Sequence, residues 1–158
     1  MILYHGTTSE FDIIDLSKSA VGKDFGCGFY LSDDVKQARD LASFKAFLLS
    51  ATPIVLSFEF NENCLTDGSL RTLRFDDYTR EWADFILMNR QNHSRINLHE
   101  YDFVYGPIAN DRVGAHIRNL LEGNIDMDTF MNRLQFIKGI TYQYFFGTER
   151  AVAHLRRI

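Results

Sequence analysis

The uneven spacing of the strand-like segments is the feature that most constrains the fold of this chain. Apolar, β-branched and aromatic residues gather in five short runs with the composition of strands: residues 1–5, 27–32, 54–60, 101–106 and 140–146. The intervals between these runs differ too much for the regular alternation of strand and helix in a parallel α/β fold. The sequence therefore predicts an α+β fold with a mixed or antiparallel sheet.

Apolar residues at helical spacing predict the elements around this sheet. They recur on one face, as in amphipathic helices, in segments 33–50, 75–89, 110–123, 126–138 and 148–158. Ser32 or Asp33 is expected to cap the first helix, and Asn110 or Asp111 the third. The buried face of the first helix is expected to consist of Val35, Ala38, Leu41, Ala42, Ala46 and Leu49.

Length, charge and cysteine content limit the kinds of protein this chain can be. The 158 residues fit a single domain, 1–158, that can bury a core without disulfides. The net charge of −4 gives no overall basic surface for duplex binding, although a small nucleic-acid acceptor stays open. Cys27 and Cys64 belong to no metal-binding or disulfide pattern. Neither a signal peptide nor a membrane span is indicated, so we expect a cytoplasmic protein.

The first motif with chemical potential lies where the opening strand ends, in Leu3-Tyr4-His5-Gly6-Thr7-Thr8. A glycine has no Cβ, so another molecule can approach its backbone closely. His5 can donate or accept a hydrogen bond near neutral pH. Taken alone, the motif is better explained by a structural histidine at the end of a strand that is hydrogen-bonded to a loop.

Two later stretches add an aromatic ring and an amide. The first is Gly26-Cys27-Gly28-Phe29-Tyr30-Leu31-Ser32, which matches neither common nucleotide-binding glycine pattern. Strand parity places Tyr30 on one face with Gly28 and Ser32, which predicts an aromatic surface with space over it, although a core tyrosine is the alternative. Gln143 lies in an aromatic strand, where its amide needs partners, so its role is structural or ligand-binding.

These three stretches, in this order, resemble the motifs of the ADP-ribosyltransferase superfamily. The resemblance is to the His-Tyr-Glu branch, which contains diphtheria toxin and the poly(ADP-ribose) polymerases. His5-Gly6 resembles the first motif, residues 26–32 resemble Gly-Lys-Gly-Ile-Tyr-Phe-Ala, and Gln143 lies on the strand that would carry the Glu. Four segments further resemble a bacterial family associated with toxin–antitoxin and phage-defence settings: Tyr-His-Gly-Thr, Asp-Phe-Gly-x-Gly-Phe-Tyr-Leu, Val-Tyr-Gly-Pro-Ile-Ala-Asn-Asp and Gln-Tyr-Phe-Phe-Gly-Thr-Glu.

The resemblance implies a single-domain ADP-ribosyltransferase-like fold, with a split mixed or antiparallel sheet and flanking helices. It implies NAD as substrate, no metal, and catalytic roles for His5, Tyr30 and Gln143. His5 would hydrogen-bond the adenosine ribose, the Gly6 backbone would hold the nicotinamide amide, and Tyr30 would stack on the nicotinamide ring. The full set of implied NAD contacts is His5, Gly6, Thr7, Tyr30 and Ser32.

The chain departs from the family pattern at the positions that finish the site. Gln143 replaces the Glu, and an amide can hold a ribose hydroxyl but cannot act as a base. Ala38 and Leu41 stand where polymerase-like members have Ser and Tyr, so Phe44 is a candidate for the second stacking ring. Thr141 stands where arginine-modifying relatives carry Gln or Glu, so arginine is not favoured as acceptor.

Other charged residues have a site role and a structural role as alternatives. Glu149 either replaces the missing carboxylate or places a favourable charge in the first turn of a helix. Asp102, Asp111 and Arg112 bracket a Tyr-Gly-Pro turn. They either contact acceptor or phosphate, or serve as a strand-end carboxylate and a helix cap with its neighbour.

The function that this resemblance predicts is mono-ADP-ribosylation, the transfer of one ADP-ribose from NAD to a macromolecular acceptor, either protein or nucleic acid. The expected setting is a bacterial toxin or defence effector, with a neutralising antitoxin protein as partner. The alternatives are a non-catalytic module that binds NAD or ADP-ribose, and an NAD glycohydrolase, in which water is the acceptor.

Overall fold

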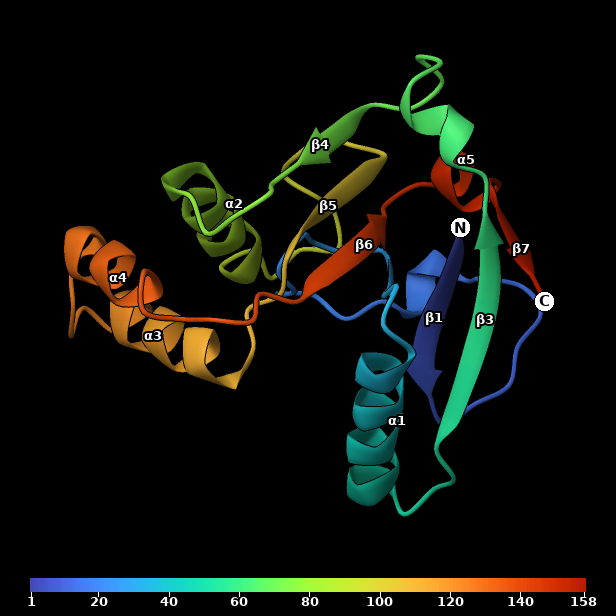
Figure 1. Cartoon of the computed structure of the whole chain (residues 1–158), viewed down its shortest axis with the longest axis horizontal. Coiled ribbons are helices and arrows are strands. Elements are labelled where there is room, and N and C mark those ends of the chain that lie inside the picture. The colour runs from blue at the N-terminus through green and yellow to red at the C-terminus, as the bar shows by residue number, and fades with distance from the viewer.

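The computed structural model describes residues 1–158 and contains two β-sheets with helices around them (Figure 1). The first sheet is antiparallel and has the strand order β1 (Ile2–Thr7), β3 (Ile54–Phe60) and β7 (Leu155–Arg157). The second has the order β2 (Phe29–Leu31), β6 (Tyr142–Phe146), β5 (Phe103–Pro107) and β4 (Thr72–Arg74). Only β4 runs parallel to its neighbour. The predicted α+β class with a mixed sheet is therefore confirmed.

The helices are α1 (Val35–Leu49), α2 (Arg80–Arg90), α3 (Asp111–Leu121), α4 (Met127–Leu134) and the short α5 (Glu149–Val152). Two 3-10 turns cover Leu16–Lys18 and Glu62–Leu65. Helix α1 lies along β1 and β3, whereas α3 and α4 form a pair at the other end of the molecule (Figure 1). Asn110 caps α3, as predicted.

The cap of α1 differs from the prediction because Ser32 and Asp33 still belong to the strand connection. Asp34 is the capping residue, and its carboxylate accepts a hydrogen bond from the amide of Lys36. Ser32 instead forms a backbone bridge with Tyr4, in which each amide donates to the other's carbonyl at 2.7 and 2.9 Å. This bridge joins β1 of the first sheet to β2 of the second.

The core consists of two apolar clusters on opposite faces of the second sheet. Strand β6 contributes to both, because its side chains alternate: Phe146 enters the first cluster and Phe145 the second. The first cluster fills the space between the two sheets and includes Leu3, Leu56, Phe58, Phe60 and Phe103. The second lies under α2, α3 and α4 and includes Trp82, Ile86, Val113, Ile117 and Phe130.

The predicted C-terminal helix over 148–158 is wrong. Helix α5 ends at Val152, and residues Leu155–Arg157 form β7, which pairs with β3 from Phe58 to Phe60. Backbone pairing decides the outcome, since without β7 this edge of β3 would leave N–H and C=O groups unpaired.

The predicted helix over 75–89 begins five residues late. Thr79 caps α2 through a hydrogen bond from the amide of Trp82, and residues Thr72–Arg74 pair with β5 as an additional strand. The apolar residues before the cap are buried in a loop and not on a helix face. Phe75 and Tyr78 belong to the second core cluster.

The buried face of α1 is narrower than predicted. Only Ala38, Ala42 and Ala46 are fully buried, while Leu41 and Leu49 are exposed. The cause lies in β1, where a Cβ on Gly6 would stand 2.1 Å from the carbonyl oxygen of Ala38. Small residues let the helix approach the strand this closely, and larger side chains remain outside the contact.

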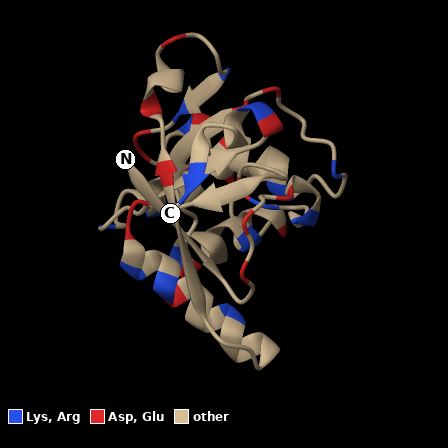
Figure 2. Ribbon diagram, turned by 90° about the vertical axis from the view of Figure 1, so that its right-hand side faces the viewer, with Lys and Arg blue, Asp and Glu red and all other residues tan.

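Basic and acidic residues are interspersed along the chain (Figure 2). This pattern agrees with the small net charge of −4. No helix has the length and continuous apolar character needed to cross a membrane.

Candidate functional site

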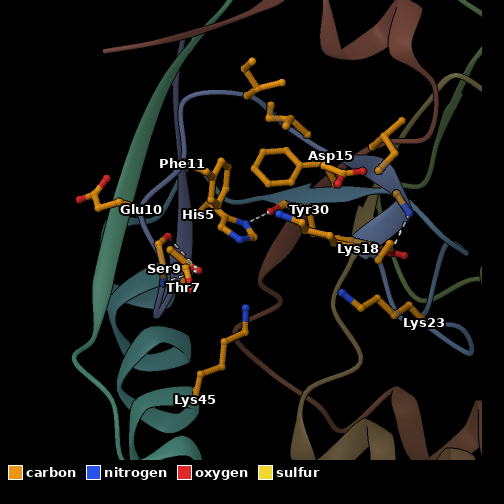
Figure 3. A pocket seen from close by; sticks show the side chains of 16 residues that line it. His5, Thr7, Ser9, Glu10, Phe11, Asp15, Lys18, Lys23, Tyr30 and Lys45 are labelled. Atoms are coloured by element: carbon orange, nitrogen blue, oxygen red, sulfur yellow. Dashed lines mark hydrogen bonds between the residues drawn. The ribbon is translucent and has the colours of Figure 1, made fainter.

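Two cavities share Tyr30 as a lining residue at the junction of β1 and β2. The lysine cavity has a volume of about 310 Å³ and is lined by His5, Thr7, Tyr30, three lysines and the loop that follows β1 (Figure 3). The glutamine cavity has a volume of about 210 Å³. Its lining includes Gly6, Tyr30, Ser32, Leu41 and Gln143.

The structure brings all the site residues predicted from the resemblance to these two cavities. His5 and Thr7 line the lysine cavity, and Gly6, Ser32 and Gln143 line the glutamine cavity. These residues come from both sheets, because β2 pairs with β6 on one side and is bridged to β1 on the other. The junction of the sheets therefore places the first and the late strand beside one site.

His5 is oriented by a single hydrogen bond. Its Nδ1 lies 2.8 Å from the carbonyl oxygen of Tyr30, which can only accept, so Nδ1 carries the proton. Burial lowers the pKa of His5 to about 4, against the opposing effect of this hydrogen bond, and nearby Lys45 and Lys23 lower it further. The ring is therefore neutral at pH 7, and Nε2 is an acceptor for a ligand hydroxyl.

Three lysines without carboxylate partners surround the lysine cavity: Lys18, Lys23 and Lys45. None of them forms an ion pair. Burial lowers the pKa of Lys23 and of Lys45, and the charge of Lys23 lowers that of Lys45 further. Lys45 reaches from α1 toward His5 (Figure 3). Lys45 is partly buried and the other two lysines are exposed, while two carboxylates, Glu10 and Asp15, also line the cavity. The excess of lysines over carboxylates favours an anionic ligand.

Gly6 contributes its backbone to the site. The side of Gly6 where other residues carry a Cβ is covered by α1, so a ligand cannot approach there. The backbone of α1 occupies the space beside its Cα. Backbone hydrogen bonds alternate in direction along an antiparallel strand. Tyr4 directs its N–H and C=O toward Ser32, so Gly6, two residues on, presents its own toward the same edge. There Lys45 Nζ donates to the Gly6 carbonyl at 2.8 Å.

Tyr30 is both a core residue and a cavity wall. Its hydroxyl donates to the Gly26 carbonyl at 2.7 Å and accepts from the Phe25 amide at 3.0 Å. The predicted space beside it is filled, because Phe145 packs against its ring and would stand 2.2 Å from a Cβ on Gly28. Lys23 Nζ lies 4.9 Å from the centroid of the ring. Tyr30 is thus held in place by the hydrogen bonds of its hydroxyl and by Phe145, with the ammonium group of Lys23 beside its ring.

Gln143 is nearly buried, and only one end of its amide has a partner. Nε2 donates to Oδ2 of Asp24 at 3.0 Å. Oε1 accepts no hydrogen bond within the protein, and it is not among the fully buried polar atoms that lack a partner. No Asp or Glu lines the glutamine cavity. Asp24 begins the Asp-Phe-Gly-x-Gly-Phe-Tyr-Leu segment, but the sequence assigned it no role, and the three lysines were not singled out. The loops and the helix that carry these residues give no indication of where their side chains meet.

Of the other residues considered from the sequence for a role in the site, Ala38 and Leu41 line the glutamine cavity, and the rest lie outside both cavities. Asp102 is buried and accepts hydrogen bonds from the Arg71 amide, Thr148 and Arg150, so it fastens β5 to its neighbours. Phe44 is 60% exposed and lines neither cavity, whereas Leu41 lines the glutamine cavity. The remaining residues that line neither cavity are Asp111, Arg112, Thr141 and Glu149.

No group of three or more His, Cys, Asp or Glu side chains is placed to hold a metal ion.

Comparisons with known proteins identify a family. Searches of the curated proteins and of the solved structures found no significant match. One family model, described as "Protein of unknown function (DUF3990)", matches residues 1–156. The chain therefore belongs to the DUF3990 family.

Proposed function

We propose that this protein is a mono-ADP-ribosyltransferase that moves one ADP-ribose from NAD to a macromolecular acceptor. The observation that carries the proposal is the convergence of His5, Tyr30 and Gln143 on two cavities that share Tyr30. The resemblance in sequence assigns these residues to the same dinucleotide. It also extends the proposal to a bacterial toxin or defence effector with a neutralising protein partner.

The chemistry of each cavity suits one half of NAD. In the lysine cavity, ammonium groups without ion-pair partners are available to the pyrophosphate, and the free Nε2 of His5 is available to a hydroxyl of the adenosine ribose. In the glutamine cavity, Tyr30 and the apolar side chain of Leu41 provide surfaces for a planar heterocycle. At the edge of β1, Gly6 presents its backbone amide to the carboxamide, together with a carbonyl that already accepts from Lys45 Nζ.

Transfer would begin with cleavage of the bond between the ribose C1′ and the nicotinamide nitrogen. The bonding electrons go to the pyridinium ring, which leaves as neutral nicotinamide, and the ribose passes through an oxocarbenium-like state. Gln143 holds a ribose hydroxyl and contributes the dipole of its amide, so the site acts by positioning and by partial charge. The acceptor then donates an electron pair to C1′, and its proton passes to water, because Gln143 cannot take it.

A second candidate function is a module that binds NAD or ADP-ribose without turnover. It is favoured by one observation, the absence of a carboxylate from the lining of the glutamine cavity. Without a full negative charge near C1′, the site stabilises the cation less than a Glu-bearing site would.

Incubation with labelled NAD, with and without cell lysate, separates these functions. We expect label on macromolecules together with released nicotinamide, and loss of both in Tyr30→Ala. Release of nicotinamide without labelled macromolecules would identify an NAD glycohydrolase, and saturable binding with neither product would identify the binding module. A complete lack of NAD binding in calorimetry would overturn the proposal.

A further inference from the structure

Asp24 is the buried carboxylate nearest to the residues of the candidate site. It lies in the loop before β2 and is 9% exposed. Its Oδ1 accepts from Arg90, at 2.8 Å from Nε and 2.7 Å from an Nη atom. Its Oδ2 accepts from Gln143 Nε2 at 3.0 Å and lies 3.4 Å from the amide nitrogen of Ala109. Both oxygens of this carboxylate therefore accept hydrogen bonds from the protein.

This carboxylate determines which end of the Gln143 amide enters the cavity. A carboxylate only accepts hydrogen bonds, so the NH₂ group of Gln143 must face Asp24. In the reverse orientation, Gln143 Oε1 would face Oδ2 of Asp24. The two oxygens would repel each other, because neither carries a proton to donate. Oε1 consequently points away from Asp24, has no partner in the protein, and belongs to a side chain that lines the glutamine cavity.

We propose that Asp24 is a positioning residue, which fixes the Gln143 amide so that Oε1 accepts a hydrogen bond from a hydroxyl of the nicotinamide-side ribose. The proposal rests on the proposed function, since it takes the ligand to be NAD. Asp24 also polarises the amide, because a donor bound to a charged acceptor makes the opposite oxygen a stronger acceptor. Arg90 supplies the positive charge that makes burial of Asp24 tolerable.

The hydrogen bond between Gln143 and Asp24 accounts for the presence of Gln at a position where the resemblance leads one to expect Glu. A Glu at position 143 would bring a second carboxylate to about 3 Å from Oδ2 of Asp24. Two carboxylates in contact cannot both be ionised, so one would hold a proton or turn away. Gln143 is the residue that presents an oxygen to the cavity while donating to Asp24.

Three variants test this arrangement: Asp24→Asn, Gln143→Glu and the double variant. In Asp24→Asn, Arg90 retains the oxygen of the new amide, so its NH₂ faces Gln143 and forces that amide to reverse. The NH₂ group of Gln143 then faces the cavity in place of Oε1, so the ribose hydroxyl loses its acceptor. We expect kcat for nicotinamide release to fall about tenfold or more. In Gln143→Glu alone, kcat for nicotinamide release should fall as well. The double variant should recover, because Glu at 143 accepts from the new amide and again offers oxygen to the ribose.

The measurements are kcat and KM for nicotinamide release and the dissociation constant of NAD, each corrected for the folded fraction. Asp102→Asn is the matched control, since it neutralises another buried carboxylate that lies outside both cavities, and its kcat should match wild type. If wild type binds NAD without turnover, the same loss and recovery should appear in the dissociation constant. An equal fall in kcat, or in NAD affinity, in Asp24→Asn and in the double variant would overturn the positioning role. A failure of wild type to bind NAD would overturn the proposed function.

Discussion

At the scale of single residues, burial determines the charge of His5. A histidine with an ordinary pKa would be partly protonated in the unfolded chain near pH 6.5, whereas the folded state lowers that pKa to about 4. Between these values the unfolded state binds more protons. The free energy of unfolding therefore has its full value above pH 6.5 and falls as the pH decreases toward 4.

This difference predicts a pH-dependent stability that can be assigned to one side chain. We expect wild type to lose on the order of 3 kcal/mol more than His5→Gln between pH 7 and pH 4, measured by urea unfolding. The comparison with a variant is needed because burial also lowers the pKa of His99, which acts in the same direction. His93→Gln, at an exposed position, is the control and should follow wild type. Parallel curves for wild type and His5→Gln would show that His5 is not buried as described.

Residue types could be predicted at this scale better than residue contacts. His5, Tyr30 and Gln143 were recognised from their motifs, and all three line the cavities. The partners of Gln143 could not be predicted, because Asp24 and Gln143 are 119 positions apart in the sequence. The same holds for Lys45, whose approach to Gly6 depends on the packing of α1 against β1.

At the scale of elements, close contact between α1 and β1 depends on Gly6. A Cβ at this position would lie 2.1 Å from the carbonyl oxygen of Ala38 and 2.9 Å from the amide nitrogen of Ala42. Both atoms belong to the helix backbone, so the clash cannot be relieved by turning a side chain. The helix as a whole would have to move away from the sheet.

Gly6→Ala is therefore expected to destabilise the protein by about 3 kcal/mol or more, as overpacking of a tight contact does. Gly114→Ala provides the matched control, because a Cβ there would find its nearest neighbours, the Ala109 carbonyl oxygen and an Arg118 Nη atom, at 3.9 Å. That change should leave stability unchanged or raise it by about 0.5–1 kcal/mol. Urea unfolding of both variants measures the difference, and similar stabilities would contradict the close contact.

Elements were predictable where local signals and the fold agreed. The five predicted strands all exist, and Asn110 caps α3, because apolar runs and caps act within a few residues of one another. The end of the chain was not predictable in this way. Its apolar spacing fits a helix, but the open edge of β3 offers backbone pairing that no local pattern reveals.

At the scale of the whole molecule, the junction of two sheets produces two cavities of different character. One has unpaired positive charge, and the other has apolar and neutral polar walls. If NAD lies across Tyr30, its two halves should bind to separate parts of the protein. Substitutions in one cavity should then affect one half of the ligand and spare the other.

Lys45→Met and Leu41→Trp are the variants that test this division. Lys45→Met removes a positive charge from the lysine cavity, so we expect the affinity for ADP-ribose to fall about tenfold. Nicotinamide should bind no more weakly than to wild type, because the Gly6 carbonyl is released for its carboxamide. Leu41→Trp fills part of the glutamine cavity and should weaken nicotinamide binding while leaving ADP-ribose binding unchanged.

Calorimetric titration of each ligand into each variant gives the four affinities required. Lys36→Met is the control for Lys45→Met, since Lys36 lies on the same helix, is exposed, and pairs only with Asp40. Opposite patterns of loss in the two variants would show that Tyr30 separates two subsites of one dinucleotide site. Equal losses of both ligands in both variants would contradict the division, because a substitution confined to one cavity would then disturb the entire site.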